Sequence, residues 1–155
     1  ISGGVVALNQ YPEQYQKLRD EPSLIPNMVS EIIRWQTPLA YMRRTATREA
    51  ELAGKAIAKG DKVYLCYPSA NRDEEIFPDG DVFRIDRSPN HHLGFGVGEH
   101  FCLGSHVARL ELAIAYKHLL PRIEEIEVSG PIVRLASSLV GGVKRLPIRY
   151  KLKPA

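Results

Sequence analysis

The sequence predicts an α+β fold that is mainly helical, with a small antiparallel sheet and an irregular meander before the last helix. Three patterns lead to this prediction. Apolar residues recur at helical spacing over 1–19, 27–36 and 103–120, and they alternate with polar residues around 39–46 and 62–67. Between 68 and 101, prolines and glycines leave little periodicity of either kind.

Two helical regions precede the strands. The first, 1–19, is interrupted by Pro12, which predicts two helices rather than one. The second is expected over 27–36, with Asn27 as its N-cap. It should end just before Pro38, because the residue preceding a proline is disfavoured in helical geometry.

The predicted strands are short and separated by turns. Segments 39–46 and 62–67 flank a turn at Gly60 and favour two or three antiparallel strands. Two further strands are expected at 123–128 and 146–152.

The last helix follows a long irregular stretch. Segment 68–101 is expected to be either functional or disordered, since such long loops are uncommon in compact domains. The helix over 103–120 should end before Pro121. Its sequence carries one apolar stripe, made of Leu103, Val107, Leu110 and Ile114.

Composition indicates one soluble domain. The chain has 155 residues, 44% of them hydrophobic and 25% charged. Its net charge of +3 is too small to indicate nucleic acid as the main partner. We find neither a membrane span nor a signal peptide, so we expect a cytoplasmic protein. Because the chain begins at Ile1, within an expected helix, we expect a fragment.

The segment from Leu93 to Gly104 concentrates the chemistry, and three interpretations compete for it. A phosphate loop requires glycines spaced G-x-G-x-x-G, and this segment does not have that spacing. A zinc site would need four ligands at recognisable separations, and only one cysteine is close by. Zinc nevertheless stays an alternative, with its ligands drawn from His91, His92, His100, Cys102 and His106.

The third interpretation starts from the position of Cys102, between a glycine-rich loop and a helix. Free backbone N–H groups at a helix start stabilise an anion, which favours a thiolate. Gly96, Gly98 and Gly104 leave room for a flat, bulky group close to the backbone. A haem iron with a proximal thiolate fits both features, although an inert buried thiol is the more common role of a lone cysteine.

The decisive pattern is Phe95-Gly96-x-Gly98-x-His100-x-Cys102-x-Gly104, which resembles the haem-binding signature of the cytochrome P450 monooxygenases. The resemblance implies the C-terminal part of that fold, with 1–155 belonging to one haem-thiolate domain whose N-terminal half is absent. It implies haem b as the cofactor and Cys102 as both its metal ligand and the catalytic cysteine. Phe95 would shield the thiolate.

Other segments resemble the same family. Glu31-Ile32-Ile33-Arg34 matches its E-x-x-R helix, which implies a buried ion-paired triad of Glu31, Arg34 and Arg87. His100 would bind a haem propionate, and so would Arg44, with Arg43 as the alternative. The implied substrate-pocket residues are Leu39, Ala40, Leu139 and Val140.

The resemblance also implies partners and an activity. The expected reaction inserts one atom of dioxygen into a C–H bond of a lipophilic substrate, such as an alkane, fatty acid, terpenoid or steroid side chain. Electrons would come from a ferredoxin-like donor, docking on a basic face to which four residues contribute. These residues are Arg72, Arg109, Lys117 and Arg122.

The family's distal-helix proton relay would precede Ile1 and is not in this sequence. We therefore expect the isolated chain to be inactive, and a second hypothesis stays open. In it, the chain is a non-catalytic remnant that binds haem weakly or not at all.

Overall fold

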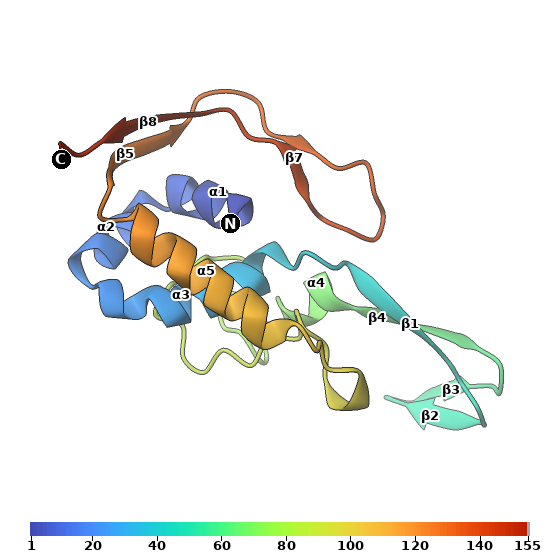
Figure 1. Cartoon of the computed structure of the whole chain (residues 1–155). Helices are drawn as coiled ribbons and strands as arrows, with labels where there is room; N and C mark the ends of the chain where they lie inside the picture. Colours follow the sequence, from blue (N-terminus) through green and yellow to red (C-terminus); the bar gives the residue numbers. More distant parts are fainter. Residues whose placement is uncertain (155) are drawn as a thin grey trace.

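The computed structural model describes residues 1–154 and has the α+β architecture that the sequence predicts. Helices form the body, and paired strands lie above it and project from one end (Figure 1). The elements, in chain order, are α1 (Ser2–Gln10), α2 (Pro12–Asp20), the 3-10 turn η1 (Pro22–Leu24), α3 (Ile25–Gln36), β1 (Tyr41–Thr45), β2 (Ala50–Leu52), β3 (Lys55–Ile57), β4 (Lys62–Cys66), α4 (Tyr67–Ala70), the 3-10 turn η2 (Gly98–His100), α5 (Ser105–Leu119), β5 (Ile123–Val128), β6 (Val133–Arg134), β7 (Val143–Arg145) and β8 (Ile148–Leu152).

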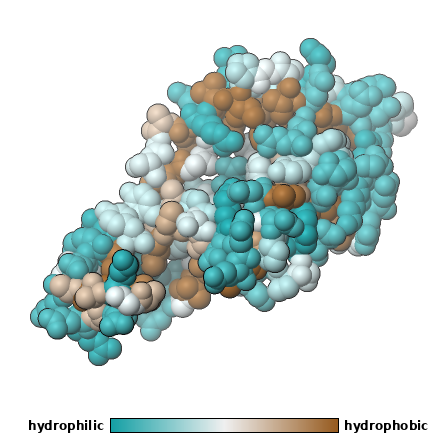
Figure 2. All heavy atoms as spheres, turned by 180° about the vertical axis from the view of Figure 1, so that it is seen from behind, coloured by the Kyte–Doolittle hydropathy of each residue, from teal (hydrophilic) through white to brown (hydrophobic). Residues whose placement is uncertain are grey.

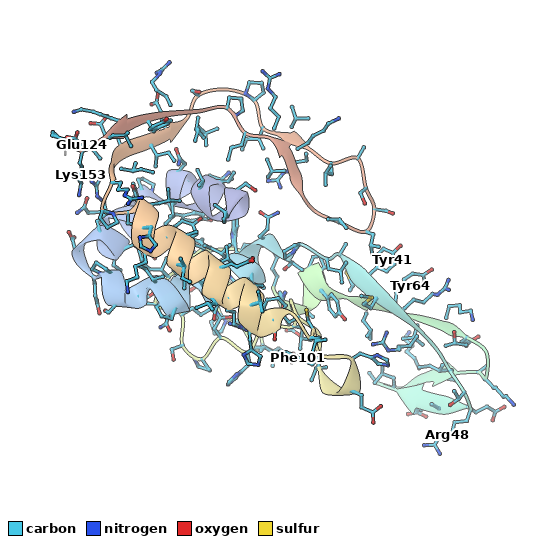
Figure 3. The ribbon with its side chains drawn as sticks, viewed as in Figure 1. Tyr41, Arg48, Tyr64, Phe101, Glu124 and Lys153 are labelled. Atoms are coloured by element: carbon cyan, nitrogen blue, oxygen red, sulfur yellow. The ribbon has the colours of Figure 1, made fainter. Side chains whose placement is uncertain are left out.

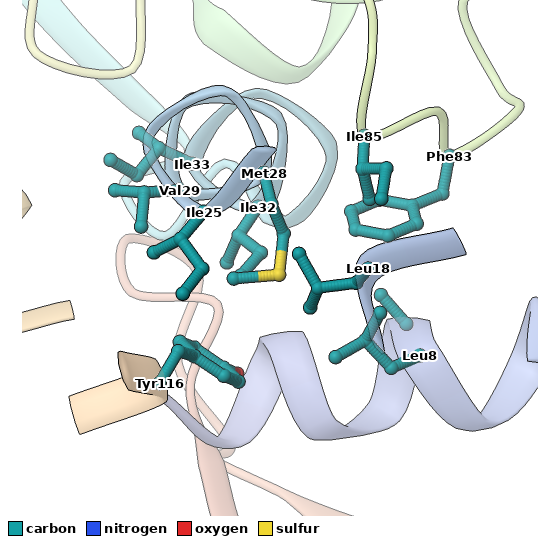
Figure 4. Close-up of a cluster of buried hydrophobic side chains, with 11 residues drawn as sticks. Leu8, Leu18, Ile25, Met28, Val29, Ile32, Ile33, Phe83, Ile85 and Tyr116 are labelled. Atoms are coloured by element: carbon teal, nitrogen blue, oxygen red, sulfur yellow. The ribbon is translucent and has the colours of Figure 1, made fainter. Parts of the chain in front are cut away.

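The core lies where α1, α2, α3 and α5 meet. Met28 of α3 lies beside Leu18 of α2, and Tyr116 of α5 reaches the same cluster (Figure 4). Phe83 and Ile85, from the irregular segment, close it on another side. A segment with little regular structure is therefore fixed in place by apolar burial, which is the dominant favourable contribution to folding.

The start of α3 differs from the prediction. The helix begins at Ile25, and its N-cap is Leu24 rather than Asn27. Pro26 lies in the first turn, where its missing N–H leaves no hydrogen bond unmade. The predicted end is confirmed, because the residue after Gln36, Thr37, adopts a left-handed conformation with φ +40°.

The strands form two-stranded antiparallel ribbons. β1 pairs with β4 in a register that places Met42 opposite Leu65 and Arg44 opposite Val63. β2 pairs with β3, and β5 with β8, so the predicted strands around 39–46, 62–67, 123–128 and 146–152 are confirmed. Tyr41 and Tyr64 lie together on the outer face of the first ribbon (Figure 3), with ring centres 5.2 Å apart.

The apolar stripe of α5 does not face the core. The helix begins at Ser105, so Leu103, predicted as the first residue of the stripe, lies in the turn before it and is 98% exposed. Val107, Leu110 and Ile114 are exposed as well. The buried side of the helix instead carries Ser105 and Tyr116. Helical spacing establishes that the three residues within the helix share a face, but not what that face contacts.

The surface is mixed in character. Seen from behind, the projecting end of the ribbons is largely hydrophilic, and hydrophobic atoms gather nearer the top of the body (Figure 2). Within residues 1–154, no helix combines the length and the apolar character needed to cross a bilayer.

Candidate cofactor site at the Cys102 loop

The loop from Leu93 to Gly104 is folded by backbone hydrogen bonds. The Cys102 N–H donates to the Phe95 carbonyl at 2.9 Å, which closes the loop on itself. Gly96 and Gly98 have φ values of +73° and +72°, a region that side chains with a Cβ resist. These two glycines are thus required by the turn that carries Cys102.

Cys102 lies three residues before α5, and its side chain is exposed. No side-chain cap occupies the first turn of the helix. The unpaired N–H groups of that turn, with the positive end of the helix dipole, favour negative charge near the loop. A Cβ added at Gly104 would lie 3.9 Å from the Cys102 Sγ, so this glycine also keeps the sulfur's surroundings open.

A cavity of about 470 Å³ opens beside the thiol. Cys102, Phe95 and Gly96 line it from the loop, and Leu39 and Met42 line it from the segment around β1. Its lining is mostly apolar, with few polar groups, as is usual for small-molecule sites. A second cavity, of about 280 Å³, adjoins it and shares Arg44, Tyr67, Gly96 and His100.

Arg44 and His100 each line both cavities, and they come from two different elements. Arg44 comes from β1 and His100 from the turn η2 within the loop. Arg43 does not line either cavity, because successive residues of a strand point to opposite faces. Of the two arginines that the sequence offered, Arg44 is therefore the one positioned to meet an anionic group in the cavity.

The proposed substrate-pocket residues form two adjacent pairs, Leu39–Ala40 and Leu139–Val140, which lie side by side although about a hundred positions of the chain separate them. Leu39 forms an isolated antiparallel bridge with Val140, and the Ala40 N–H donates to the Leu139 carbonyl at 2.8 Å. Leu39 lines the larger cavity, whereas Leu139 and Val140 are each 40% exposed. The structure thus joins the two segments at the edge of the cavity.

The triad proposed from the sequence is assembled and buried. The Glu31 carboxylate accepts from Arg34 Nε and Nη2, both at 2.8 Å, and from Arg87 Nε at 3.3 Å. Arg34 and Arg87 also donate to backbone carbonyls of segment 71–82. Buried charges persist only when paired and fully hydrogen-bonded, and here they tie the irregular segment to α3.

Asn71 is a positioning residue that the sequence reasoning did not single out. Its side chain is fully buried, donates to Thr37 Oγ1 at 3.0 Å and accepts the Leu93 N–H at 2.7 Å. It therefore connects the end of α3 to the start of the Cys102 loop. An asparagine in a polar, irregular segment gives no sequence signal for such a role.

His92 and Phe95, at the start of the loop, form a cluster with Arg109 of α5. The Arg109 guanidinium is 5.1 Å from the centre of the Phe95 ring, and its Nη2 lies 3.2 Å from His92 Nε2. Burial and then the charge of Arg109 lower the pKa of His92 to about 4. His92 is accordingly a neutral side chain at ordinary pH.

The histidines named for a zinc site do not converge. His91, His100 and His106 are exposed, whereas His92 is buried. Within the described residues, no three His, Cys, Asp or Glu side chains group closely enough to hold a metal ion. The zinc alternative thus loses its geometric basis.

Two sequence interpretations need correction. Cys66 was expected to be a buried strand residue, but it is exposed at the end of β4. The basic face is also smaller than expected, since Arg72 donates to Asp81 and to the Trp35 carbonyl. Arg109 is engaged as described above, which leaves Lys117 and Arg122 as the exposed members of the set.

These residues fit a flat, iron-containing macrocycle that carries carboxylates. An exposed thiol lies at the cavity wall, two glycines with positive φ remove side chains beside it, and two basic side chains line the cavity. Thiolate is a strong ligand for iron, and basic side chains bind carboxylates through charge-assisted hydrogen bonds.

Comparison with known proteins now identifies the family. The family model described as cytochrome P450 matches residues 5–151. The chain belongs to the cytochrome P450 family. This confirms the resemblance drawn from the Cys102 loop and from the E-x-x-R helix.

Several relatives share this part of the P450 fold. Cytochrome P450-terp of a Pseudomonas species is 47% identical over 148 residues, which is 96% of this chain and 35% of that protein. A methyl-branched lipid omega-hydroxylase of Mycobacterium tuberculosis is 45% identical over 152 residues, covering 97% of this chain and 36% of that protein. Cytochrome P450-153 from Novosphingobium aromaticivorans has a similar structure, with a TM-score of 0.93 at 43% identity, covering 97% of this chain and 38% of that one. The chain thus spans about a third of the length of the curated relatives it matches.

Proposed function

We propose that this P450 chain carries the haem-thiolate part of a monooxygenase that acts on a lipophilic substrate. One oxygen atom of dioxygen enters a C–H bond, and the other leaves as water after uptake of two electrons and two protons. The observation that carries the proposal is the exposed Cys102 in a mostly apolar cavity that also contains Arg44 and His100.

In this proposal the cofactor is haem b, and Cys102 is its metal ligand. When bound, a thiolate-ligated haem supplies the activation of dioxygen, because the thiolate pushes electron density toward the iron. Arg44 and His100 would hold its propionates by charge-assisted hydrogen bonds. Gly96, Gly98 and Gly104 would allow the ring to approach the backbone, and Phe95 would shield the sulfur from water once the haem is bound.

The substrate class follows from the apolar edge of the cavity. Leu39 lines the cavity, and backbone pairing brings Leu139 and Val140 beside Leu39 and Ala40. These aliphatic residues favour burial of a hydrocarbon chain or terpenoid. Relatives support this class, since they include a linalool 8-monooxygenase and a steroid C26-monooxygenase. A ferredoxin-like donor is the proposed source of electrons, and the cytoplasm the proposed location.

A carbon monoxide spectrum tests the ligand assignment. Haem and reductant are added to the chain under carbon monoxide, and the Soret band is recorded. We expect the strongly red-shifted band of thiolate ligation in the native chain and in Cys66→Ala, and its loss in Cys102→Ala. A spectrum that is the same in all three chains would refute Cys102 as the ligand.

The second candidate is a non-catalytic chain with weak or no haem binding. The exposed stripe of α5 and the one-third coverage of the relatives favour it for the chain taken alone. Turnover of a lipophilic substrate with a ferredoxin system separates the two candidates. No product, together with a weak or absent thiolate band, would support the second.

A further inference from the structure

Arg109 lies on α5 and does not itself line the cavity, but both Nη atoms of its guanidinium have a partner, and its Cζ lies over the ring of Phe95, which does line the cavity. Nη1 donates to Ser30 Oγ of α3 at 2.7 Å, and Nη2 lies 3.2 Å from His92 Nε2. The Cζ atom is 5.1 Å from the centre of the Phe95 ring. One side chain thus joins α5, α3 and the start of the Cys102 loop.

His92 supports this arrangement as a neutral acceptor. The ring is 8% exposed, and its Nδ1 accepts the Gly94 N–H at 3.2 Å. A guanidinium can only donate hydrogen bonds, so a contact with Arg109 requires an unprotonated Nε2. A neutral imidazole has one acceptor nitrogen, so it accepts a full hydrogen bond either from the Gly94 N–H or from Arg109, depending on the tautomer. In both tautomers the ring is uncharged, so no second positive charge lies beside Arg109.

Phe95 connects Arg109 to Cys102, the proposed haem ligand. A cation over an aromatic face is attracted by the ring quadrupole, and the attraction grows when the pair is sheltered from water. The carbonyl of Phe95 accepts the Cys102 N–H at 2.9 Å. Phe95 therefore contacts Arg109 through its ring and fixes the Cys102 backbone through its carbonyl.

We propose that Arg109 is a positioning residue, which holds the Phe95 ring and thereby keeps Cys102 in the geometry for ligating the haem iron. The proposal rests on the proposed function of Cys102. It also gives Arg109 a role inside the fold in place of the role on the donor-docking face that the sequence suggested. Ser30 and His92 orient the guanidinium for this task.

Hydrogen exchange of the full chain, without added haem, tests the positioning directly. Arg109→Met removes the charge and the donors, and Lys117→Met is the matched control, since Lys117 is an exposed cation of the same helix. We expect roughly tenfold faster exchange of the Cys102 amide in Arg109→Met, measured relative to β5 and β8. The control should leave this ratio unchanged. No change in Arg109→Met, or an equal change in β5 and β8, would overturn the proposal.

A double-mutant cycle tests whether Arg109 acts through Phe95. In a Phe95→Leu chain, the further change Arg109→Met should accelerate the Cys102 amide by less than about twofold. A repeated tenfold effect in that background would overturn the proposed route. Arg109→Lys keeps a cation near the Phe95 ring and should restore part of the protection of the Cys102 amide. Exchange of this amide as fast as in Arg109→Met would show that the positive charge is not what holds the ring.

The Soret band adds a readout that a general loss of stability would not produce. With haem, reductant and carbon monoxide, Arg109→Met should show a smaller fraction of the thiolate band than Lys117→Met at equal folded concentration. Equal fractions would overturn the proposal. If the native chain itself shows no thiolate band, the proposed function fails, and the exchange ratio alone then decides whether Arg109 holds the loop.

Discussion

Glu31→Gln removes one negative charge from the centre of a buried network while almost preserving side-chain volume. The Glu31 carboxylate accepts hydrogen bonds from Arg34, Arg87 and Asn90 side chains and from the Arg84 N–H. Glu31 and Arg34 are fully buried, and Arg87 is 5% exposed. The substitution would leave two guanidinium groups facing a neutral amide.

The expected cost follows from the burial of these charges. Removing one partner of a buried ion pair costs about 3–5 kcal/mol, because the other charge stays desolvated. The glutamine oxygen still accepts one or two of the hydrogen bonds, so we expect a loss of about 4 kcal/mol in the free energy of unfolding. Domains are stable by only about 5–15 kcal/mol. A fall in Tm of roughly 10 °C should accompany the change.

Urea unfolding followed by circular dichroism measures this loss. Glu127→Gln is the matched control, since it makes the same chemical change in an exposed ion pair with Arg149. Exposed pairs contribute below about 1 kcal/mol, so the control should unfold almost like the native chain. If Glu31→Gln also loses less than about 1 kcal/mol, the reasoning from buried charge is wrong.

Three further predictions concern buried polar groups and close packing. Asn71→Leu removes the acceptor of the part-buried Leu93 N–H and one of the two partners of the Thr37 hydroxyl, and should cost about 1–3 kcal/mol in urea unfolding; no measurable loss would contradict this. Gly4→Ala would place a methyl group against the Tyr116 hydroxyl and should cost about 1–3 kcal/mol by the same measurement. Because the folded pKa of His92 is about 4, the unfolded chain takes up this proton first, and stability should fall by about 3 kcal/mol between pH 6.5 and pH 4. His92→Gln should remove this component of the pH dependence, whereas substitution of the exposed His118 should not.

The elements themselves were largely predictable from sequence, because spacing reports local geometry directly. Pro12 divided α1 from α2, and alternation located β1 and β4. The N-cap of α3 was placed wrongly because Pro26 is accepted inside a first turn. Cys66 was expected to be buried because alternation shows which residues share a face but not which face the protein covers.

The candidate site likewise has residues that could be predicted from the sequence and residues that could not. Cys102 and its glycines could be found because a short loop must encode its own turn in local residue types. Asn71 could not, because its partners Thr37 and Leu93 are 34 and 22 positions away. The same holds for Arg109, whose contact with Ser30 spans 79 positions. Long-range hydrogen bonds of this kind depend on tertiary packing, which the spacing of residue types along the chain does not reveal.

The pairing of β1 with β4 has a consequence for insertions and deletions. Met42 and Arg44 line the cavity, and Tyr41 and Tyr64 pack on the opposite side of the ribbon. A one-residue slip of β1 against β4 would turn the shifted β1 side chains to the other face. Because Arg43 and Arg44 are consecutive, such a slip would still direct one guanidinium toward the cavity and one away from it, so the cavity keeps a cation in either register, while Met42 would leave the cavity.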